Sequence, residues 1–311
     1  MYLGVDAGGT KTAFVIVDAA GTVLGAADGP STAPALGEHG LETAQAVLRD
    51  GITEVCRLAG TEPMRLRHAF FGLPGHGESP SLSAALDALP EQILGHDRFA
   101  VGNDMVCGWA GSLGLADGIN VISGTGSMAY GVLRGREART GGWGELFGDE
   151  GSAHWIAVQA LNLFTRMSDG RTPPGPLLAV LRRRLGLDTD LDLVDVMLLG
   201  RPDRTAVAAV SRHVSEAAAE GDTHCARILT RAGEELAELA RAARRALSAA
   251  PDEKVPVSWS GGVFTVPRVR EAFTRALTAF PEPYDARPPL GAPVNGAALL
   301  AARLAGEPLN A

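Results

Sequence analysis

Short apolar runs separated by glycine turns open the chain, and their spacing predicts β-strands. Residues 2–6 form the first run, a glycine pair follows, and residues 12–18 carry the apolar stretch FVIV. Gly21 then turns the chain into a further short strand around residues 23–24. Runs and turns in this order predict a strand meander rather than a strand that leads into a helix.

Helical spacing replaces this pattern further along the chain. In residues 41–59, apolar side chains recur every three or four positions, which predicts an amphipathic helix. The same reasoning predicts further strands at 69–71, 99–101, 120–123, 128–133 and 255–259. It predicts further helices at 150–166, 223–248, 267–279 and 294–305, and a proline-rich break at 173–176.

The unit of strand, glycine turn and returning strand occurs twice, once around residues 8–9 and once around residues 124–127. This repeat suggests an ancient internal duplication. The 311 residues are enough for two domains of roughly 100–200 residues each.

Composition narrows the classes of function. The chain has 28 Lys and Arg against 36 Asp and Glu, a net charge of −8 with no basic block, so nucleic acid is not an expected partner. No apolar run reaches the roughly 18 residues that span a bilayer, and the first residues lack the pattern of a signal peptide. The three cysteines form no CxxC pair, and the histidines show no zinc-binding spacing. We expect a soluble, cytoplasmic protein that binds no membrane.

Candidate chemistry begins at the first glycine turn. Gly8 and Gly9 let backbone N–H groups turn toward an anion, and Thr10 and Lys11 add a hydroxyl and a cation, which suits phosphate binding. Asp6, at the strand end, could hold Mg²⁺ through water. An ordinary hairpin turn explains the same residues, and the spacing matches neither a Walker A loop nor a GxGxxG helix start.

Two later glycine turns carry related chemistry. Gly124-Thr125-Gly126-Ser127 repeats the first loop in the second half of the chain, so the two loops together could hold the phosphates of a nucleotide. After the strand at 255–259, Gly261 and Gly262 offer backbone without side chains, against which a flat adenine ring could pack. Each of these segments can equally be a structural turn.

A carboxylate follows the predicted strand at 99–101. Asn103 and Asp104 stand at its carboxyl end, where side chains of α/β folds point into a crevice, so Asp104 suits a base for a substrate hydroxyl. Capping of a following helix by Asn103 or Asp104 is the alternative.

In order and spacing, these motifs resemble the actin–hexokinase–Hsp70 ATPase superfamily, in the branch of BadF-type ATPases and N-acetylglucosamine kinases. The matching segments are residues 6–10, 103–104, 124–127, 260–262 and the closing GAPVNGA at 291–297. The resemblance implies an α/β, two-domain, actin-like (ribonuclease H-like) fold with an interdomain cleft. It divides the chain into residues 1–115 plus 296–311 and residues 116–295.

A narrower resemblance concerns the sugar. GGWG at 141–144 and GDEGSAHWIA at 148–157 are similar to a stretch of N-acetylglucosamine kinases, which implies that Gly141, Gly142 and Asp149 contact the sugar together with Asn103 and Asp104. Judged without the resemblance, Asp149 could equally cap a helix beginning at residue 150. The family has an asparagine where this chain has Ala33, which leaves the identity of the amino sugar open.

The resemblance therefore implies an ATP- and Mg²⁺-dependent amino-sugar kinase, with N-acetylglucosamine and its 6-hydroxyl as the first expectation. Glucosamine and an N-acetylmuramic acid type of sugar are alternatives, and a homodimer is expected. An ATPase that activates a radical dehydratase is the alternative of another class. The three scattered cysteines argue against it, because such activators bridge an iron–sulfur cluster through paired cysteines.

Overall fold

The computed structural model describes residues 1–32 and 40–309, which divide into two compact units. Unit 1 comprises Met1–Asn120, Ser258–Ser260 and Arg287–Ala311, and unit 2 comprises Val121–Val257 and Gly261–Ala286. Each unit is built on a five-stranded sheet. Among the described residues, no helix combines the length and the apolar character needed to cross a membrane. The predicted domain ranges stay a prediction.

The sheet of unit 1 is mixed. Its strand order is β3 (Val23–Pro30), β2 (Lys11–Val17), β1 (Tyr2–Ala7), β4 (His68–Gly72) and β5 (Phe99–Gly102). The first three strands form the predicted antiparallel meander, whereas β1, β4 and β5 run parallel. Asp6 pairs in register with Gly72, and Gly72 with Gly102, so the carboxyl ends of these three strands meet at one edge of the sheet.

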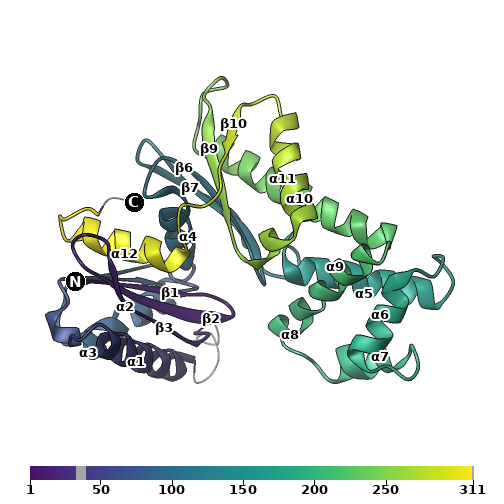
Figure 1. Ribbon diagram of the computed structural model, residues 1–311, viewed down its shortest axis with the longest axis horizontal. Coiled ribbons are helices and arrows are strands. Elements are labelled where there is room, and N and C mark those ends of the chain that lie inside the picture. The colour runs from purple at the N-terminus through teal and green to yellow at the C-terminus, as the bar shows by residue number, and fades with distance from the viewer. Residues whose placement is uncertain (33–39, 310–311) are drawn as a thin grey trace. The chain divides into compact units, whose positions relative to one another are not determined.

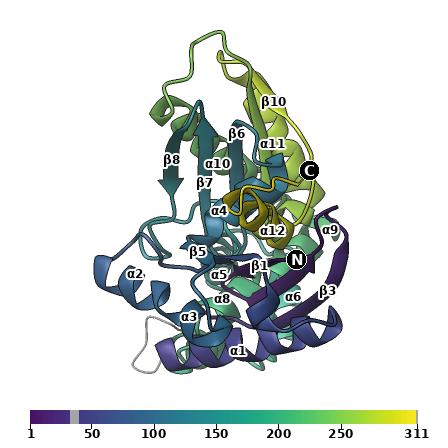
Figure 2. The same cartoon turned by 90° about the vertical axis from the view of Figure 1, so that its left-hand side faces the viewer.

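Helices cover both faces of this sheet (Figures 1 and 2). They are α1 (Gly40–Leu58), α2 (Pro80–Asp87), α3 (Leu89–Leu94), α4 (Asp104–Leu113) and α12 (Pro293–Leu304), with a 3-10 turn, η2, at Pro63–Arg65. One face of β1 carries Leu3 and Val5, which are fully buried in a core with Leu48 and Ile52 of α1. The opposite face carries Gly4, which α12 approaches closely.

Unit 2 holds the second mixed sheet. Its order is β10 (Tyr284–Ala286), β9 (Val255–Ser260), β6 (Gly118–Ser123), β7 (Ser127–Leu133) and β8 (Arg136–Gly141). The division between the two units runs through β6 and β9. Residues 118–120 at the start of β6 and residues 258–260 at the end of β9 belong to unit 1, and the rest of both strands belongs to unit 2. The helices and short turns are α5 (Ala153–Ser168), α6 (Pro176–Leu185), α7 (Asp192–Val194), the π-helix η3 (Asp195–Leu199), α8 (Arg204–Ala209), α9 (Ser211–Ala219), α10 (Thr223–Ala246), the 3-10 turn η4 (Gly262–Thr265) and α11 (Pro267–Ala279).

Most predicted elements are confirmed, and the differences have physical reasons. The helix expected from residue 150 begins at Ala153, because the Ser152 side chain accepts a hydrogen bond from the Trp155 N–H and caps it. Strand β8 was not predicted, since REARTG has no apolar alternation and is held by its ladder with β7. The three-residue strand β10 and the short helices α2 and α3 are too brief for a periodic signal.

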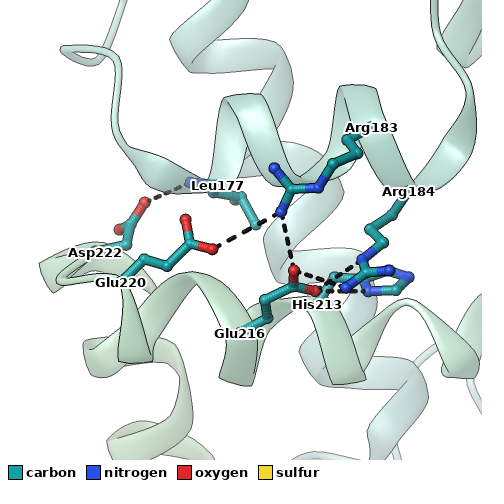
Figure 3. Close-up of polar contacts among 7 residues, drawn as sticks. All are labelled: Leu177, Arg183, Arg184, His213, Glu216, Glu220 and Asp222. Atoms are coloured by element: carbon teal, nitrogen blue, oxygen red, sulfur yellow. Dashed lines mark hydrogen bonds and ion pairs between the residues drawn. The ribbon is translucent and has the colours of Figure 1, made fainter.

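Ion pairs join α6 to α9 in unit 2 (Figure 3). Glu216 lies 2.9 Å from Nη2 of both Arg183 and Arg184, and 3.5 Å from Nδ1 of His213. Arg183 also lies 3.8 Å from Glu220. Hydrogen bonding from Arg184, with the charges of both arginines, lowers the pKa of Glu216 to about 2. The carboxylate of Glu216 therefore connects Arg183 and Arg184 of α6 to α9.

We predict that Glu216→Gln lowers the melting temperature at neutral pH. The pKa of Glu216 is lower in the folded than in the unfolded protein. The stabilisation that ionised Glu216 gives to the folded state is therefore present above about pH 4.5 and is lost as the pH falls toward 2. The difference from wild type should shrink over that range in thermal melts. Glu220→Gln, which removes the longer ion pair, is the control; equal effects at both positions would contradict a special role for Glu216.

A second prediction concerns Gly4. A Cβ at this position would lie 2.6 Å from the carbonyl oxygen of Val294 in α12. This oxygen belongs to the helix backbone, so it cannot move away by a change of rotamer. We expect Gly4→Ala to destabilise the protein by about 3 kcal/mol through overpacking. At Gly29, in the same sheet, a Cβ would meet Phe14 and Val47 at ordinary distances of 3.5 and 3.6 Å. Gly29→Ala should change stability by less than about 0.5 kcal/mol in denaturant titrations.

Candidate active site

In unit 1, β1 and α4 bring two carboxylates together. Asp6 lies near the end of β1, and Asp104 is the first residue of α4. Burial, followed by the negative charge of Asp104, raises the pKa of Asp6 to about 7. The approach is possible because residue 72 is glycine: a Cβ there would collide with Sγ of Cys107 and lie 3.2 Å from the Cα of Asp104. The predicted metal residue and the predicted base are therefore close neighbours.

Asn103 has a structural role in this arrangement. Its side-chain oxygen accepts a hydrogen bond from the Met105 N–H, and its amide nitrogen donates to the carbonyl of His76 at 2.9 Å. Asn103 is thus the N-cap of α4, as the capping alternative expected, and fixes where Asp104 stands. Its contact with a sugar stays a prediction.

The first glycine turn joins β1 to β2. The N–H of Gly8 donates to the carbonyl of Lys11 at 2.9 Å, which closes the turn. A Cβ on Gly9 would meet no atom of the described residues within 4 Å, so the backbone here borders open space among them. Lys11 is exposed, and its Nζ lies 2.8 Å from a carboxylate oxygen of Asp28. Lys11 is therefore paired with Asp28 in this structure and is not an isolated cation.

In unit 2, hydrogen bonds tie the second glycine loop to the start of α5. The N–H of Ala153 donates to the carbonyl of Gly124 at 2.9 Å, and that of His154 donates to Thr125 at 3.3 Å. The hydroxyl of Ser127 donates to the carbonyl of Glu150 at 2.7 Å. The loop at 124–127 and the segment at 149–153 thus form one hydrogen-bonded structure.

The predicted sugar residues that lie in unit 2 join the same structure. The N–H of Gly142 donates to the carbonyl of Ser127 at 2.9 Å, and Gly141 pairs in register with Met128 across β7 and β8. Asp149 accepts a hydrogen bond of 3.4 Å from the N–H of Ser127. The capping alternative for Asp149 was wrong, because Ser152 caps α5.

Asp149 has an unusual environment for a carboxylate. Only 2% of the residue is exposed, and its φ of 58° lies in the left-handed region, where residues other than glycine are uncommon. Burial raises the pKa of Asp149, and the charge of Arg204 opposes that increase. Non-glycine residues held in this conformation occur often at ligand sites, where the surrounding structure fixes them.

The turn after β9 lies beside the second loop. Gly261 has a φ of +98°, and a Cβ there would collide with the carbonyl of Ser123 and lie 3.1 Å from the N–H of Gly124. A Cβ on Gly262 or on Gly124, in contrast, would meet no atom within 4 Å in the part of the chain that the structure describes. Unit 2 therefore brings together the predicted adenosine turn, the second phosphate loop and the predicted sugar residues at 141, 142 and 149, whereas residues 8–11 and 103–104 belong to unit 1. Ala33, the departure from the family pattern, lies outside the described residues.

Arg204 is the site residue that sequence reasoning missed. It begins α8, and its guanidinium forms ion pairs with Asp149 and with Glu145. No motif surrounds it; the single local signal is Asp203, whose side chain caps α8 by accepting from the Ala206 N–H. That signal marks the start of a helix and says nothing of what the next side chain contacts.

Comparison with known proteins identifies the family. The family profile described as the BadF/BadG/BcrA/BcrD ATPase family matches residues 3–301. The chain belongs to this family. It is 31% identical over 264 residues to an N-acetylmuramic acid/N-acetylglucosamine kinase of Clostridium acetobutylicum, covering 84% of each chain. It is 28% identical over 274 residues to an N-acetyl-D-glucosamine kinase of Dictyostelium discoideum, covering 84% of this chain and 85% of the relative.

Solved structures confirm the actin-like ATPase fold that the BadF-family resemblance implied. A candidate N-acetylglucosamine kinase from Chromobacterium violaceum superposes with a TM-score of 0.78 at 26% identity, covering 96% of this chain and 98% of that one. A ROK family glucokinase from Streptomyces griseus, solved with glucose and AMPPNP, has a TM-score of 0.59 at 20% identity, covering 97% and 99%. The second likeness concerns the fold alone.

The raised pKa of Asp6 leads to a prediction about stability. The pKa of Asp6 is higher in the folded than in the unfolded protein. The free energy of unfolding therefore decreases as the pH rises from about 4 to 7, and above pH 7 this decrease stays constant. Asp6→Asn removes the ionisation. The variant should exceed wild type by about 1 kcal/mol at pH 4.5 and by at most about 4 kcal/mol at pH 8, at about 1.4 kcal/mol per pKa unit.

Urea unfolding of both proteins between pH 4.5 and 8 measures this difference. Asp50→Asn, at an exposed position of α1, is the matched control and should follow wild type throughout. Parallel profiles for Asp6→Asn and wild type would show that Asp6 ionises normally.

Proposed function

We propose that this BadF-family protein is an ATP-dependent amino-sugar kinase, with N-acetylglucosamine as the first substrate to test and its 6-phosphate as the product. The observation that carries the proposal is the hydrogen-bonded structure of unit 2, in which the glycine loop at 124–127 is joined to Asp149 and the start of α5. Contacts suited to a phosphate and to a sugar hydroxyl are thereby adjacent. The kinase relatives support the same activity.

The glycine backbones fit a nucleotide. Within the described residues, Gly9, Gly124 and Gly262 all border open space that a side chain would partly fill. We propose that Gly8, Gly9, Thr10 and Lys11, together with Gly124, Thr125, Gly126 and Ser127, contact the phosphates, and that Gly261 and Gly262 contact adenosine. Backbone N–H groups suit such contacts because they donate hydrogen bonds without bulk.

Asp104 is the proposed base. It would accept the proton of the sugar hydroxyl as that oxygen attacks the terminal phosphorus of ATP, while Asn103 holds the start of α4 in place. Asp6 is the side chain we propose to hold Mg²⁺ through water, and the bound ion supplies neutralisation of phosphate charge. Gly141, Gly142 and Asp149 would orient the sugar, which brings the reacting hydroxyl into line.

The alternatives differ in substrate or in class. Glucosamine and an N-acetylmuramic acid type of sugar remain candidates, and the Clostridium relative's name includes the latter. An activator ATPase of the radical dehydratase type needs cysteines that hold an iron–sulfur cluster. All three cysteines of this chain are buried, and burial raises the pKa of each thiol, which favours the kinase. Assembly as a homodimer stays a prediction.

We predict that Asp104→Asn lowers sugar-dependent turnover by about 10²–10⁴-fold, the usual contribution of a positioned base. Binding of ADP should persist, because the substitution keeps the size of the side chain. A coupled ADP-release assay with ATP, Mg²⁺ and N-acetylglucosamine measures turnover, and Asp50→Asn controls for loss of a distant carboxylate.

The same assay decides the substrate when it includes N-acetylglucosamine, N-acetylmuramic acid, glucosamine, N-acetylmannosamine and glucose. Turnover with one amino sugar supports the kinase and names its substrate. Turnover by Asp104→Asn close to wild type would remove Asp104 as the base. ATP hydrolysis that no sugar stimulates, together with bound iron, would favour the activator instead.

A further inference from the structure

Arg204 contacts the second glycine loop and the proposed sugar carboxylate at once. Its Nη2 forms an ion pair with Oδ2 of Asp149, and its Nε lies 3.2 Å from a carboxylate oxygen of Glu145. A Cβ added to Gly126 would collide with the same Nη2, so the guanidinium rests directly on the backbone of the loop. All four residues belong to unit 2.

The contact with Asp149 matters because that carboxylate is buried. A charged group out of water needs a partner of opposite charge or hydrogen bonds, otherwise it takes up a proton. The N–H of Ser127 is a distant donor at 3.4 Å, which leaves Arg204 as the strong partner among the contacts that the structure describes. An ionised Asp149 offers both oxygens as acceptors to sugar hydroxyls, whereas a protonated one does not.

The contact with Gly126 matters because phosphate is proposed to bind there. The side chain of Arg204 is 38% exposed, so an anion at the loop can reach its guanidinium. Arginine binds phosphate oxygens with paired N–H groups, and it can do so while changing partners among nearby carboxylates. A phosphate at the loop would therefore compete with Asp149 for the guanidinium.

We propose that Arg204 is a positioning residue that couples the nucleotide to the sugar. Without nucleotide it holds Asp149 in place; with nucleotide its guanidinium turns toward the phosphate, and Asp149 takes its hydrogen bonds from sugar hydroxyls. Each ligand then strengthens the binding of the other, as reciprocal linkage requires. This inference rests on the proposed kinase function, because that function assigns Asp149 to the sugar.

The test compares wild type, Arg204→Gln and Arg204→Lys by calorimetry. In wild type, ADP with Mg²⁺ should tighten the binding of N-acetylglucosamine by about 5-fold or more, which is the usual lower range of coupling between two sites. In Arg204→Gln the factor should fall to about 1, and ADP affinity should drop several-fold. Arg204→Lys, which keeps the charge, should restore part of both effects. Arg212→Gln, at an exposed position of α9, should behave as wild type.

A second readout needs no sugar and no turnover. The pKa of Asp149, followed by carbon NMR in the full chain, should rise in Arg204→Gln, because the cation that opposes the effect of burial is gone. The charges of Glu145 and Glu150 also act on Asp149, and those of Asp149 and Arg204 act on His154, so the signals of all three residues are followed alongside. Lysine at position 204 should return the pKa of Asp149 toward its wild-type value.

The outcomes separate this inference from the proposed function. If wild type neither binds nor phosphorylates any sugar of the panel, the kinase proposal fails, while the ADP affinity and the pKa of Asp149 still report on Arg204. An Arg204→Gln protein that folds, with ADP affinity, coupling and Asp149 pKa all unchanged, would overturn the inference. A loss of thermal stability alone, with coupling intact, would also overturn it, since Arg204 would then be structural.

Discussion

The close approach of backbone to backbone in unit 1 is the constraint on which the candidate base depends. Gly4 and Gly72 leave no room for a side chain between the sheet and the helices α12 and α4. Gly111 and Gly296 bring α4 and α12 together in the same way, since a Cβ on either would collide with the other helix or its leading turn. Because α4 is held this near the sheet, its first residue, Asp104, stands beside Asp6.

This proximity has an energetic consequence that links the fold to the chemistry. Burial raises the pKa of Asp6 to about 7, and the nearby charge of Asp104 adds to the increase, because two carboxylates close together in a site of low polarity cannot both ionise freely. A bound cation would relieve it, because positive charge favours the ionised form of both groups. The ligand-free protein therefore carries a local cost that the proposed magnesium–nucleotide complex would offset, as is common where a site is arranged for a ligand rather than for stability.

Much of this could be predicted from the sequence, and the limits have physical reasons. The glycine loops, the meander, the long helix α10 and the position of Asp104 follow from local patterns of turns and apolar spacing. Asn103 illustrates the ambiguity that remained, because an asparagine before a helix serves as a cap whether or not a substrate lies near. Strand β8 forms by pairing with the preceding strand β7, and the ion pair of Lys11 with Asp28 joins the neighbouring strands β2 and β3; neither contact leaves a periodic pattern of apolar residues in the sequence.

Arg204 shows the same limit at the site itself. It lies 55 positions after Asp149, on a helix of six residues, and nothing in its neighbours distinguishes it from the other arginines. Arg204 differs from the other arginines in its partner, Asp149, a buried carboxylate with a left-handed backbone conformation that needs a compensating charge. This need can be recognised only once the structure places Asp149 against the loop at 124–127. The glycine motifs mark where a nucleotide and a sugar could bind, whereas the charge that would make one binding event depend on the other comes from outside every motif.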